Sequence, residues 1–323
     1  MSSNPTFNNK TTAEEVATVF KHRIKGKHVV ITGANIGLGK ETARVLAKEG
    51  AIITICCRTV SKGEEAKADI LKETADANIT VVPLDLSSLK SVKKCAEDYI
   101  STGKPIDILI NNAGVMACPL TKTADGFETQ FGTNHLGHFY FTELLLPVLE
   151  KSGTKDEPSR VVNLASVAAV LFAPKTGILF DDINGEKHYN SWERYGQSKL
   201  ANILYTVELN DRMKKEGKHV IAVSVHPGVI SATNLNQHLS FKSTLELLWQ
   251  VNKPLIPQLL NGSKNIPQGT ATSIVCAFDP KIEPGKYYYD CQLGTLYHPL
   301  SYDEELALKL TKFSHELIEK AAQ

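Results

Sequence analysis

The sequence lacks long apolar runs and an excess of charge of either sign. None of its 323 residues falls in a segment apolar enough to cross a bilayer, which takes about 20 residues as a helix. The first twenty residues also lack the apolar core of a signal peptide. With 36 basic and 35 acidic residues the net charge is +1, so no global field would attract nucleic acid or an anionic membrane. We expect a soluble protein with a small-molecule ligand, no nucleic-acid partner and no membrane span.

Cysteine pairs at metal-binding or redox spacing are missing as well. None of the six cysteines forms a C-x-x-C pair, and no nearby histidines complete a zinc-like pattern. The sequence therefore predicts a reduced, cytoplasmic protein without a metal site.

Strand-like and helix-like segments alternate from residue 26 onward. Runs of β-branched residues are typical of buried parallel strands, and the amphipathic stretches between them are typical of covering helices. The expected strands are KHVVITG, IITICCR, ITVVPLD, IDILINNAG, SRVVNLAS and HVIAVSVHPG, and long helices are expected over 126–152 and 195–214. The pattern predicts a single-domain α/β Rossmann fold, a doubly wound parallel sheet of about seven strands with helices on both faces. This domain would span 26–323 and follow an N-terminal extension over 1–25.

A glycine cluster, TGANIGLG, separates the first expected strand from the first helix. Gly33, Gly37 and Gly39 would allow a tight turn and a close approach of a pyrophosphate to the helix N-terminus. The strand, loop and helix context indicates a dinucleotide cofactor more strongly than the glycines do alone.

The end of the second expected strand indicates which dinucleotide binds. Cys57 and Arg58 stand where NAD-binding folds carry an acidic residue. Arg58, helped by Lys62, can pair with a 2′-phosphate, so NADP(H) is the expected cofactor. The alternative is that Arg58 only caps the strand on the surface.

The segment YGQSK places Tyr195 and Lys199 four residues apart, on one face of a helix. Such a pair also arises by chance. A phenol has a pKa of about 10, and a neighbouring ammonium group favours its ionised form, so the pair is a candidate for proton transfer.

In chain order, the glycine motif, NNAG at 111–114 and YGQSK resemble the short-chain dehydrogenases/reductases. CCRTVSKGE, LDLSSLKSV, NHLGHFYFTELLLPVL, HPG and QGTAT are similar to the branch of retinol dehydrogenases, the chloroplast translocon-associated dehydrogenase and the WW-domain oxidoreductase. The resemblance implies a catalytic tetrad of Asn134, Ser166, Tyr195 and Lys199. Tyr195 would be the general acid or base, Lys199 would lower its pKa and bind the cofactor ribose, Ser166 would donate to the substrate oxygen, and Asn134 would anchor a water leading to Lys199.

The same resemblance implies further cofactor contacts around the sheet. Pro227 and Gly228 would lie near the nicotinamide, and Thr233 is chosen for the carboxamide because Ala232 occupies the family's usual threonine position. Asp85 would contact the adenine, or belong to a helix N-cap region, or both. The full set of expected cofactor residues is Gly33, Asn35, Ile36, Gly37, Leu38, Gly39, Arg58, Lys62, Asp85, Leu86, Asn112, Ala113, Gly114, Tyr195, Lys199, Pro227, Gly228 and Thr233.

Residues 229–268 depart from the regular alternation and contain LELLWQVNKPLIPQLL. A lid of this composition would suit a lipophilic alcohol or carbonyl compound such as a retinoid, steroid or long-chain aldehyde. Packing on the body of the domain, or a peripheral membrane contact, is the alternative. The sequence is also compatible with a homodimer.

Two functions from different classes follow. The first is an NADP(H)-dependent oxidoreductase with Tyr195 as general acid and base. The second is a non-catalytic NADP(H)-binding regulatory or interaction protein, against which the complete tetrad argues. His135 and His138 are expected to serve in packing or at an interface.

Overall fold

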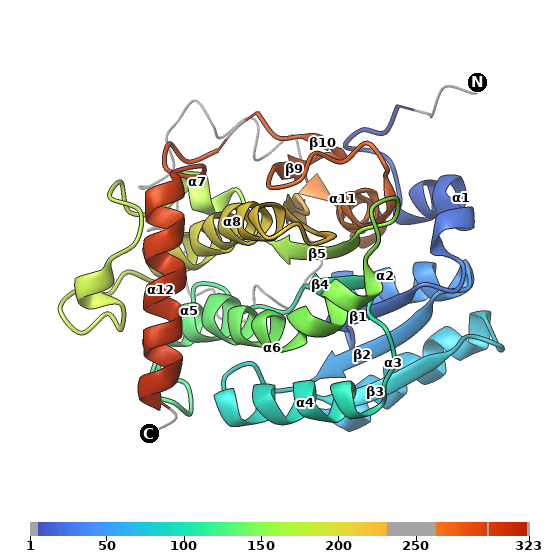
Figure 1. The fold of residues 1–323 in the computed structure, drawn as a ribbon, viewed down its shortest axis with the longest axis horizontal. Coiled ribbons are helices and arrows are strands. Elements are labelled where there is room, and N and C mark those ends of the chain that lie inside the picture. The colour runs from blue at the N-terminus through green and yellow to red at the C-terminus, as the bar shows by residue number, and fades with distance from the viewer. Residues whose placement is uncertain (1–5, 231–262, 296, 322–323) are drawn as a thin grey trace.

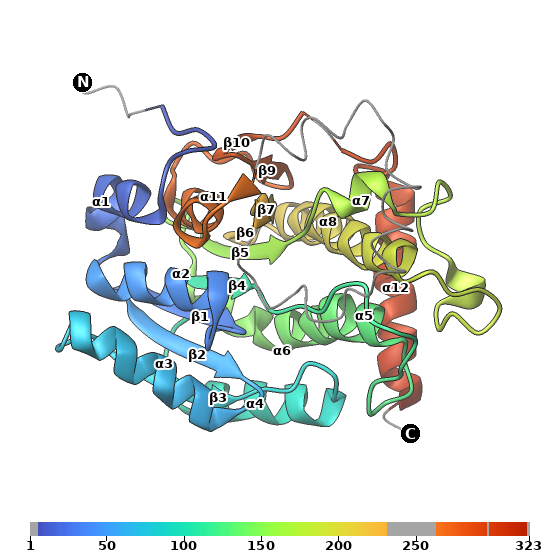
Figure 2. The same cartoon turned by 180° about the vertical axis from the view of Figure 1, so that it is seen from behind.

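The computed structural model describes residues 6–230, 263–295 and 297–321. A central eight-stranded sheet has the order β10-β9-β6-β5-β4-β1-β2-β3, and helices cover both faces (Figures 1 and 2). All neighbouring strands are parallel except β9 and β10. The predicted single-domain, doubly wound Rossmann fold is therefore confirmed. The division of the chain at residue 25 stays a prediction.

The strands of the sheet are short and mostly buried. They are β1 His28–Thr32, β2 Ile52–Cys57, β3 Ile79–Pro83, β4 Ile108–Asn111, β5 Ser159–Leu164, β6 Val220–His226, β9 Tyr287–Tyr289 and β10 Gln292–Leu293. In β1, Val29 and Ile31 enter the core on one side of the sheet, whereas Val30 enters the core on the other. This alternation explains why a strand buried on both faces reads as a continuous apolar run.

Two groups of helices cover the sheet. The first is α4 Leu89–Ser101, α6 Gly137–Ser152 and α8 Ser191–Lys215 on one face, with α12 Glu304–Ala321 packed against α8. The second is α1 Ala13–Ile24, α2 Gly37–Lys48, α3 Val60–Glu73 and α11 Ile266–Phe278 on the other face. Helix α1 packs against α2 and α11 and buries Val16, Phe20 and Ile24, so part of the N-terminal extension contributes to the core.

The helix predicted over 126–152 is interrupted. It consists of α5 Thr129–Phe131, a π-helical segment Gly132–Leu136, and α6. A π-helix hydrogen-bonds five rather than four residues along, and such turns occur frequently at functional sites. The break places Asn134 at the wide turn of the helix.

The remaining elements are short. They are α7 Ala168–Leu171, the 3-10 turn Phe180–Asp182, and a two-stranded sheet of β7 Val229–Ile230 with β8 Ser263–Lys264. The predicted lid over 229–268 falls largely outside the described residues, as does Thr233. In the part of the chain that the structure describes, no helix has both the length and the apolar character needed to cross a bilayer.

Candidate active site

The glycine cluster shapes the start of α2. Gly33 and Gly37 have left-handed φ angles of 66° and 59°, which glycine adopts without strain. A Cβ on Gly39 would lie 2.5 Å from Asn112 Nδ2 and 2.6 Å from the Gly33 carbonyl oxygen, whereas one on Gly37 would meet nothing within 4 Å. The loop is therefore tightly packed at Gly39 and has open space beside Gly37.

The N-terminus of α2 has the properties of an anion site. Its N-cap residue, Ile36, makes no side-chain cap and is 50% exposed. The first N–H groups of a helix have no intrahelical acceptor and carry a partial positive charge. Asn35 and Leu38 lie half-buried beside this end. The residues present therefore fit a dinucleotide pyrophosphate, as the glycine motif predicts.

The turn after β4 is fastened to the end of β1. The Thr32 hydroxyl accepts hydrogen bonds from the backbone N–H groups of Asn112, at 2.9 Å, and Ala113, at 3.0 Å. A Cβ on Gly114 would lie 3.1 Å from Asn134 Oδ1 and 3.5 Å from Lys199 Nζ. The structure thereby brings the predicted cofactor turn beside two residues of the predicted tetrad.

Helix α8 positions Tyr195 and Lys199. The Asn190 side chain caps it by accepting from the N–H groups of Trp192 and Glu193, which fixes where the helix begins. Lys199 Nζ lies 5.8 Å from the centroid of the Tyr195 ring and donates to the Leu164 carbonyl oxygen at 3.0 Å. The pair therefore faces the carboxyl end of β5.

Burial controls the ionisation of both groups. Tyr195 is 7% exposed and Lys199 is 4% exposed. Burial raises the pKa of Tyr195 to about 12, although a hydrogen bond with Ser166 acts in the opposite direction. Burial also lowers the pKa of Lys199 to about 8. The attraction between ammonium and phenolate is predictable from the spacing of the two residues, whereas the loss of hydration, which disfavours both charged forms, depends on burial in the fold.

Asn134 connects the π-helical segment to its neighbours. Its Oδ1 accepts from Val115 N at 2.8 Å, and its Nδ2 donates to the Val115 carbonyl at 2.9 Å and to Ser198 Oγ at 3.0 Å. Both amide hydrogens are thus used within the protein. A water on Asn134, as the family resemblance implies, would have to donate to one of its two oxygens, Oδ1 or the main-chain carbonyl oxygen.

The residues that are predicted to bind the adenine end of the cofactor differ in exposure and in their hydrogen bonds. Arg58 and Lys62 are exposed and make no ion pair with any residue that the structure describes. The Asp85 carboxylate accepts from the backbone N–H and the hydroxyl of Ser87, at 2.9 and 2.6 Å, while Leu86 is buried in the core. Asp85 therefore stabilises the turn before α4, whose N-cap residue is Ser88, and Leu86 has its side chain turned away from solvent. The adenine contact of Asp85 stays a prediction.

An ion pair between a buried lysine and an exposed carboxylate, at the end of β6, was not predicted from the sequence. Lys264 is 3% exposed, its Nζ lies 2.6 Å from Asp290 Oδ1, and its aliphatic chain covers Gly228, which has a φ of 93°. Pro227 lies half-buried next to it. No motif relates Lys264 to Gly228, because the two residues are joined only through the pairing of β7 with β8.

Arg194 was also missed, although it directly precedes Tyr195. It is fully buried and donates to the Asp182 carboxylate at 2.7 Å and to the carbonyls of Asp182 and His188, both at 2.6 Å. The guanidinium holds the irregular segment that leads into α8. The sequence offers little indication that Arg194 is buried, since arginines are usually exposed.

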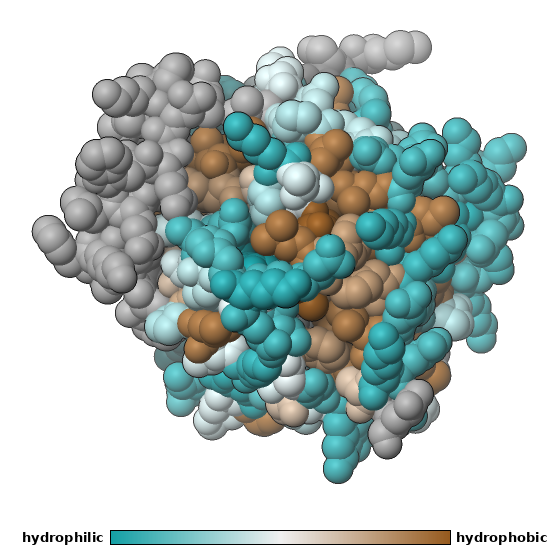
Figure 3. All heavy atoms as spheres, turned by 90° about the vertical axis from the view of Figure 1, so that its left-hand side faces the viewer, coloured by the Kyte–Doolittle hydropathy of each residue, from teal (hydrophilic) through white to brown (hydrophobic). Residues whose placement is uncertain are grey.

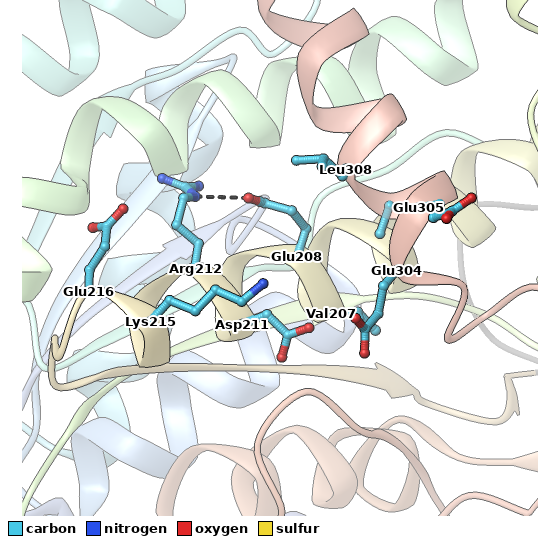
Figure 4. Close-up of a pocket in the computed structure, with 10 residues that line it drawn as sticks. Val207, Glu208, Asp211, Arg212, Lys215, Glu216, Glu304, Glu305 and Leu308 are labelled. Atoms are coloured by element: carbon cyan, nitrogen blue, oxygen red, sulfur yellow. Dashed lines mark hydrogen bonds and ion pairs between the residues drawn. The ribbon is translucent and has the colours of Figure 1, made fainter.

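A hollow of about 400 Å³ lies elsewhere, between α8 and α12 (Figure 4). Five carboxylates line it, and Arg212 Nε donates to one of them, Glu208, at 3.0 Å. The hollow lies along the C-terminal half of α8, and none of the tetrad residues lines it. The tetrad, not this hollow, marks the candidate active site.

Comparisons with known proteins agree with this geometry. Residues 27–177 match the model of the short chain dehydrogenase family. Retinol dehydrogenase 12 of Mus musculus is 48% identical over 273 residues, which cover 84% of this chain and 79% of that protein. Short-chain dehydrogenase TIC 32 A, chloroplastic, of Brassica napus is 39% identical over 323 residues, covering 97% of this chain and 94% of that protein.

A solved structure supports the same assignment. The crystal structure of an uncharacterized protein from Mycobacterium paratuberculosis has a TM-score of 0.69 and 33% identity, covering 92% of this chain and 94% of that one. Family members bind nicotinamide cofactors, and the glycine loop fits one. The chain belongs to the short-chain dehydrogenase/reductase family of oxidoreductases, in the branch that includes the retinol dehydrogenases.

Proposed function

We propose that the protein is an NADP(H)-dependent oxidoreductase that interconverts a lipophilic alcohol and its carbonyl compound. The observation that carries this proposal is the convergence of Asn134, Ser166, Tyr195 and Lys199 beside Gly114 at the carboxyl ends of the strands. When bound, the nicotinamide supplies or accepts the hydride.

The protein's own residues handle the proton. In carbonyl reduction the Tyr195 hydroxyl protonates the substrate oxygen, and in alcohol oxidation the phenolate takes that proton back. Ser166 donates a hydrogen bond to the substrate oxygen, on which negative charge develops. A protonated Lys199 favours the phenolate and thereby counteracts the burial that raises the pKa of Tyr195.

Apolar side chains around Tyr195 support a lipophilic substrate. Tyr195 packs in a cluster with Ala117, Ala168, Phe172 and Trp192, and the rings of Phe172 and Trp192 lie 5.2 Å apart. The face at the carboxyl ends of the strands also carries apolar surface among hydrophilic side chains (Figure 3). Retinol is the substrate in the names of several similar proteins.

A series of straight-chain aldehydes tests the reaction and the substrate class together, with NADPH absorbance as the measurement. We expect kcat/KM to rise roughly fourfold for each added methylene up to the length of the site, because each buried CH₂ contributes about 0.8 kcal/mol. Retinaldehyde and a steroid ketone complete the panel. Absence of NADPH oxidation with every compound, despite NADPH binding, would favour the regulatory alternative.

Arg58→Ala is expected to weaken NADPH binding about tenfold or more and to leave NADH binding unchanged. The reason is the loss of one charge-assisted hydrogen bond to the 2′-phosphate, about 1.5–3 kcal/mol. Fluorescence titration with both cofactors measures the two affinities. Lys67→Ala is the matched control, since it removes a positive charge from nearby α3 that is already 3.8 Å from Glu64. Equal affinities of the wild type for NADPH and NADH would contradict the cofactor assignment.

Gly39→Ala is expected to reduce the affinity for NADPH by at least about tenfold and to cost about 1–3 kcal/mol of stability. The added methyl group would overlap Asn112 Nδ2 and the Gly33 carbonyl, so the loop must shift. Gly103→Ala provides the control, because Gly103 has a φ of 67° but open space around it. It should lower stability by about 1 kcal/mol without changing NADPH affinity. The same loss of affinity in both variants would argue against a cofactor loop.

Location and assembly stay predictions. One of the similar proteins is named chloroplastic, so the cytoplasmic location predicted from the cysteines needs a direct test by fluorescence microscopy of a tagged chain. Sedimentation analysis would test the homodimer.

A further inference from the structure

One buried imidazole lies between the cofactor loop and the tetrad. His138 is the second residue of α6 and is 3% exposed. Its Nε2 lies 2.8 Å from the Thr32 hydroxyl, and its Nδ1 lies 3.0 Å from the main-chain oxygen of Asn134. From the sequence, His138 is expected to serve in packing or at an interface, but packing alone requires neither hydrogen bond.

The neighbouring donors determine the direction of both bonds. The Thr32 hydroxyl already accepts from Asn112 N and Ala113 N. A hydroxyl has two acceptor lone pairs and one hydrogen, so this hydrogen is left for His138 Nε2. Nδ1 then carries the ring proton and donates it to Asn134. Burial lowers the pKa of His138 to about 3, which keeps the ring neutral.

The two bonds join elements that are far apart in sequence. The imidazole is hydrogen-bonded to Thr32 at the end of β1, and Thr32 in turn is hydrogen-bonded to the turn that contains Asn112. Through its other nitrogen the imidazole holds the carbonyl of Asn134 in the π-helical segment, whose side chain is fastened to Val115 and Ser198. One ring therefore contacts both the cofactor side and the proton-transfer side of the site.

We propose that His138 is a positioning residue with a separate task for each ring nitrogen, an inference that rests on the oxidoreductase function proposed above. Nε2 holds Thr32, and with it the turn at Asn112 and Ala113 against which the cofactor lies. Nδ1–H orients the Asn134 main-chain carbonyl, one of the two oxygens of that residue that can accept from a water next to Lys199.

His135 provides a natural comparison on the same helix. It is 1% exposed, its Nε2 lies 3.0 Å from Ser314 Oγ on α12, and its side chain also interacts with Asn202. Its contacts lie on the side away from Thr32. His135→Asn therefore reports what the loss of a buried imidazole does to stability alone.

Two substitutions of His138 by residues with amide side chains, asparagine and glutamine, test the two tasks separately. Asparagine at 138 places its amide where Nδ1 was and cannot reach Thr32, whereas glutamine reaches Thr32 and leaves the Asn134 carbonyl without its donor. We expect His138→Asn to weaken NADPH binding about tenfold with little change in kcat, the size of one lost neutral hydrogen bond. His138→Gln should lower kcat about tenfold with NADPH affinity nearly unchanged. Thr32→Val should weaken NADPH binding more than His138→Asn does, because it also removes the acceptor of Asn112 N and Ala113 N, whereas Thr32→Ser should behave like the wild type.

NADPH affinity is measured by fluorescence titration, kcat by NADPH absorbance, and stability by thermal unfolding. The ¹⁵N chemical shifts of the His138 ring in the wild type give a further readout, because a neutral ring protonated at Nδ1 differs from one protonated at Nε2. A proton on Nε2, or losses of kcat and affinity that only follow melting temperature as in His135→Asn, would overturn the proposal. If the His138 variants fail to fold, the protonation state of the His138 ring nitrogens in the wild type decides, because only a proton on Nδ1 allows both hydrogen bonds. A wild type without turnover refutes the proposed function, whereas the ring tautomer and the NADPH affinities still test the role of His138.

Discussion

Replacing Tyr195 by phenylalanine is expected to lower kcat at least about 10³-fold, within the range that a positioned general acid or base contributes. The phenyl ring keeps the packing against Phe172 and Trp192, so the fold and the apolar surroundings of the site should persist. Only the proton donor and its hydrogen bond with Ser166 are lost. Single-turnover oxidation of bound NADPH, followed by absorbance, measures the step in which the proton is transferred.

Tyr140→Phe is the matched control for this variant. Tyr140 lies half-buried on α6 and makes no hydrogen bond within the part of the chain that the structure describes, so its hydroxyl should be dispensable. NADPH affinity should stay close to the wild-type value in both variants. Turnover by Tyr195→Phe within about tenfold of the wild type would remove Tyr195 from the reaction.

Stability is expected to fall steeply as the pH decreases from 6.5 to 5. His135 and His138 are both buried, and burial lowers their pKa values to about 4 and about 3. In the unfolded chain a histidine titrates near pH 6.5. Below that pH the unfolded chain therefore binds two protons that the folded chain does not, and each contributes about 1.4 kcal/mol per pH unit. The free energy of unfolding should thus decrease by close to 3 kcal/mol per pH unit from these two residues.

The direction in which stability changes with pH follows from the direction of the two pKa shifts. A folded pKa below the unfolded one means that stability is fully present above pH 6.5 and is lost as the pH falls towards the folded values. Urea unfolding at pH 7.0, 6.0, 5.5 and 5.0 measures the slope. His226 is a third histidine whose pKa burial lowers to about 3, so His135→Asn should remove about one third of the slope that these three histidines contribute, whatever its effect on stability at pH 7. An unchanged slope in that variant would show that His135 is protonated in the folded protein.

The sequence predicted the fold well where burial produces a local pattern. Apolar runs such as VVIT and IITICC become strands because both faces of the sheet are covered. It did not predict β9 and β10, which are too short for a repeating pattern, nor the π-helical turn at Asn134. A change from four to five residues per hydrogen bond leaves the apolar spacing of a single turn almost unaltered.

The residue types and spacing of the candidate site are visible in the sequence, but the burial and the contacts of those residues are not. Tyr195 and Lys199 are predicted from their spacing together with the family resemblance, whereas the pKa shifts of both depend on how many neighbours exclude water. The roles of His138 and Lys264 depend on Thr32 and Asp290, partners that only the fold brings close. Contacts between distant segments leave no periodic trace in the chain.

Helix α1 has a consequence for how the protein is made. It ends at Ile24, yet the helix that covers much of its apolar face, α11, begins at Ile266. Arg23 Nε donates to the Phe278 carbonyl at 3.0 Å, and Gln292 Nε2 to the Phe7 carbonyl at 2.6 Å. On the ribosome, the first helix therefore emerges long before its partner. Until α11 has been synthesised, Val16 and Phe20 lack their final cover, a period in which exposed apolar surface favours chaperone binding over productive packing.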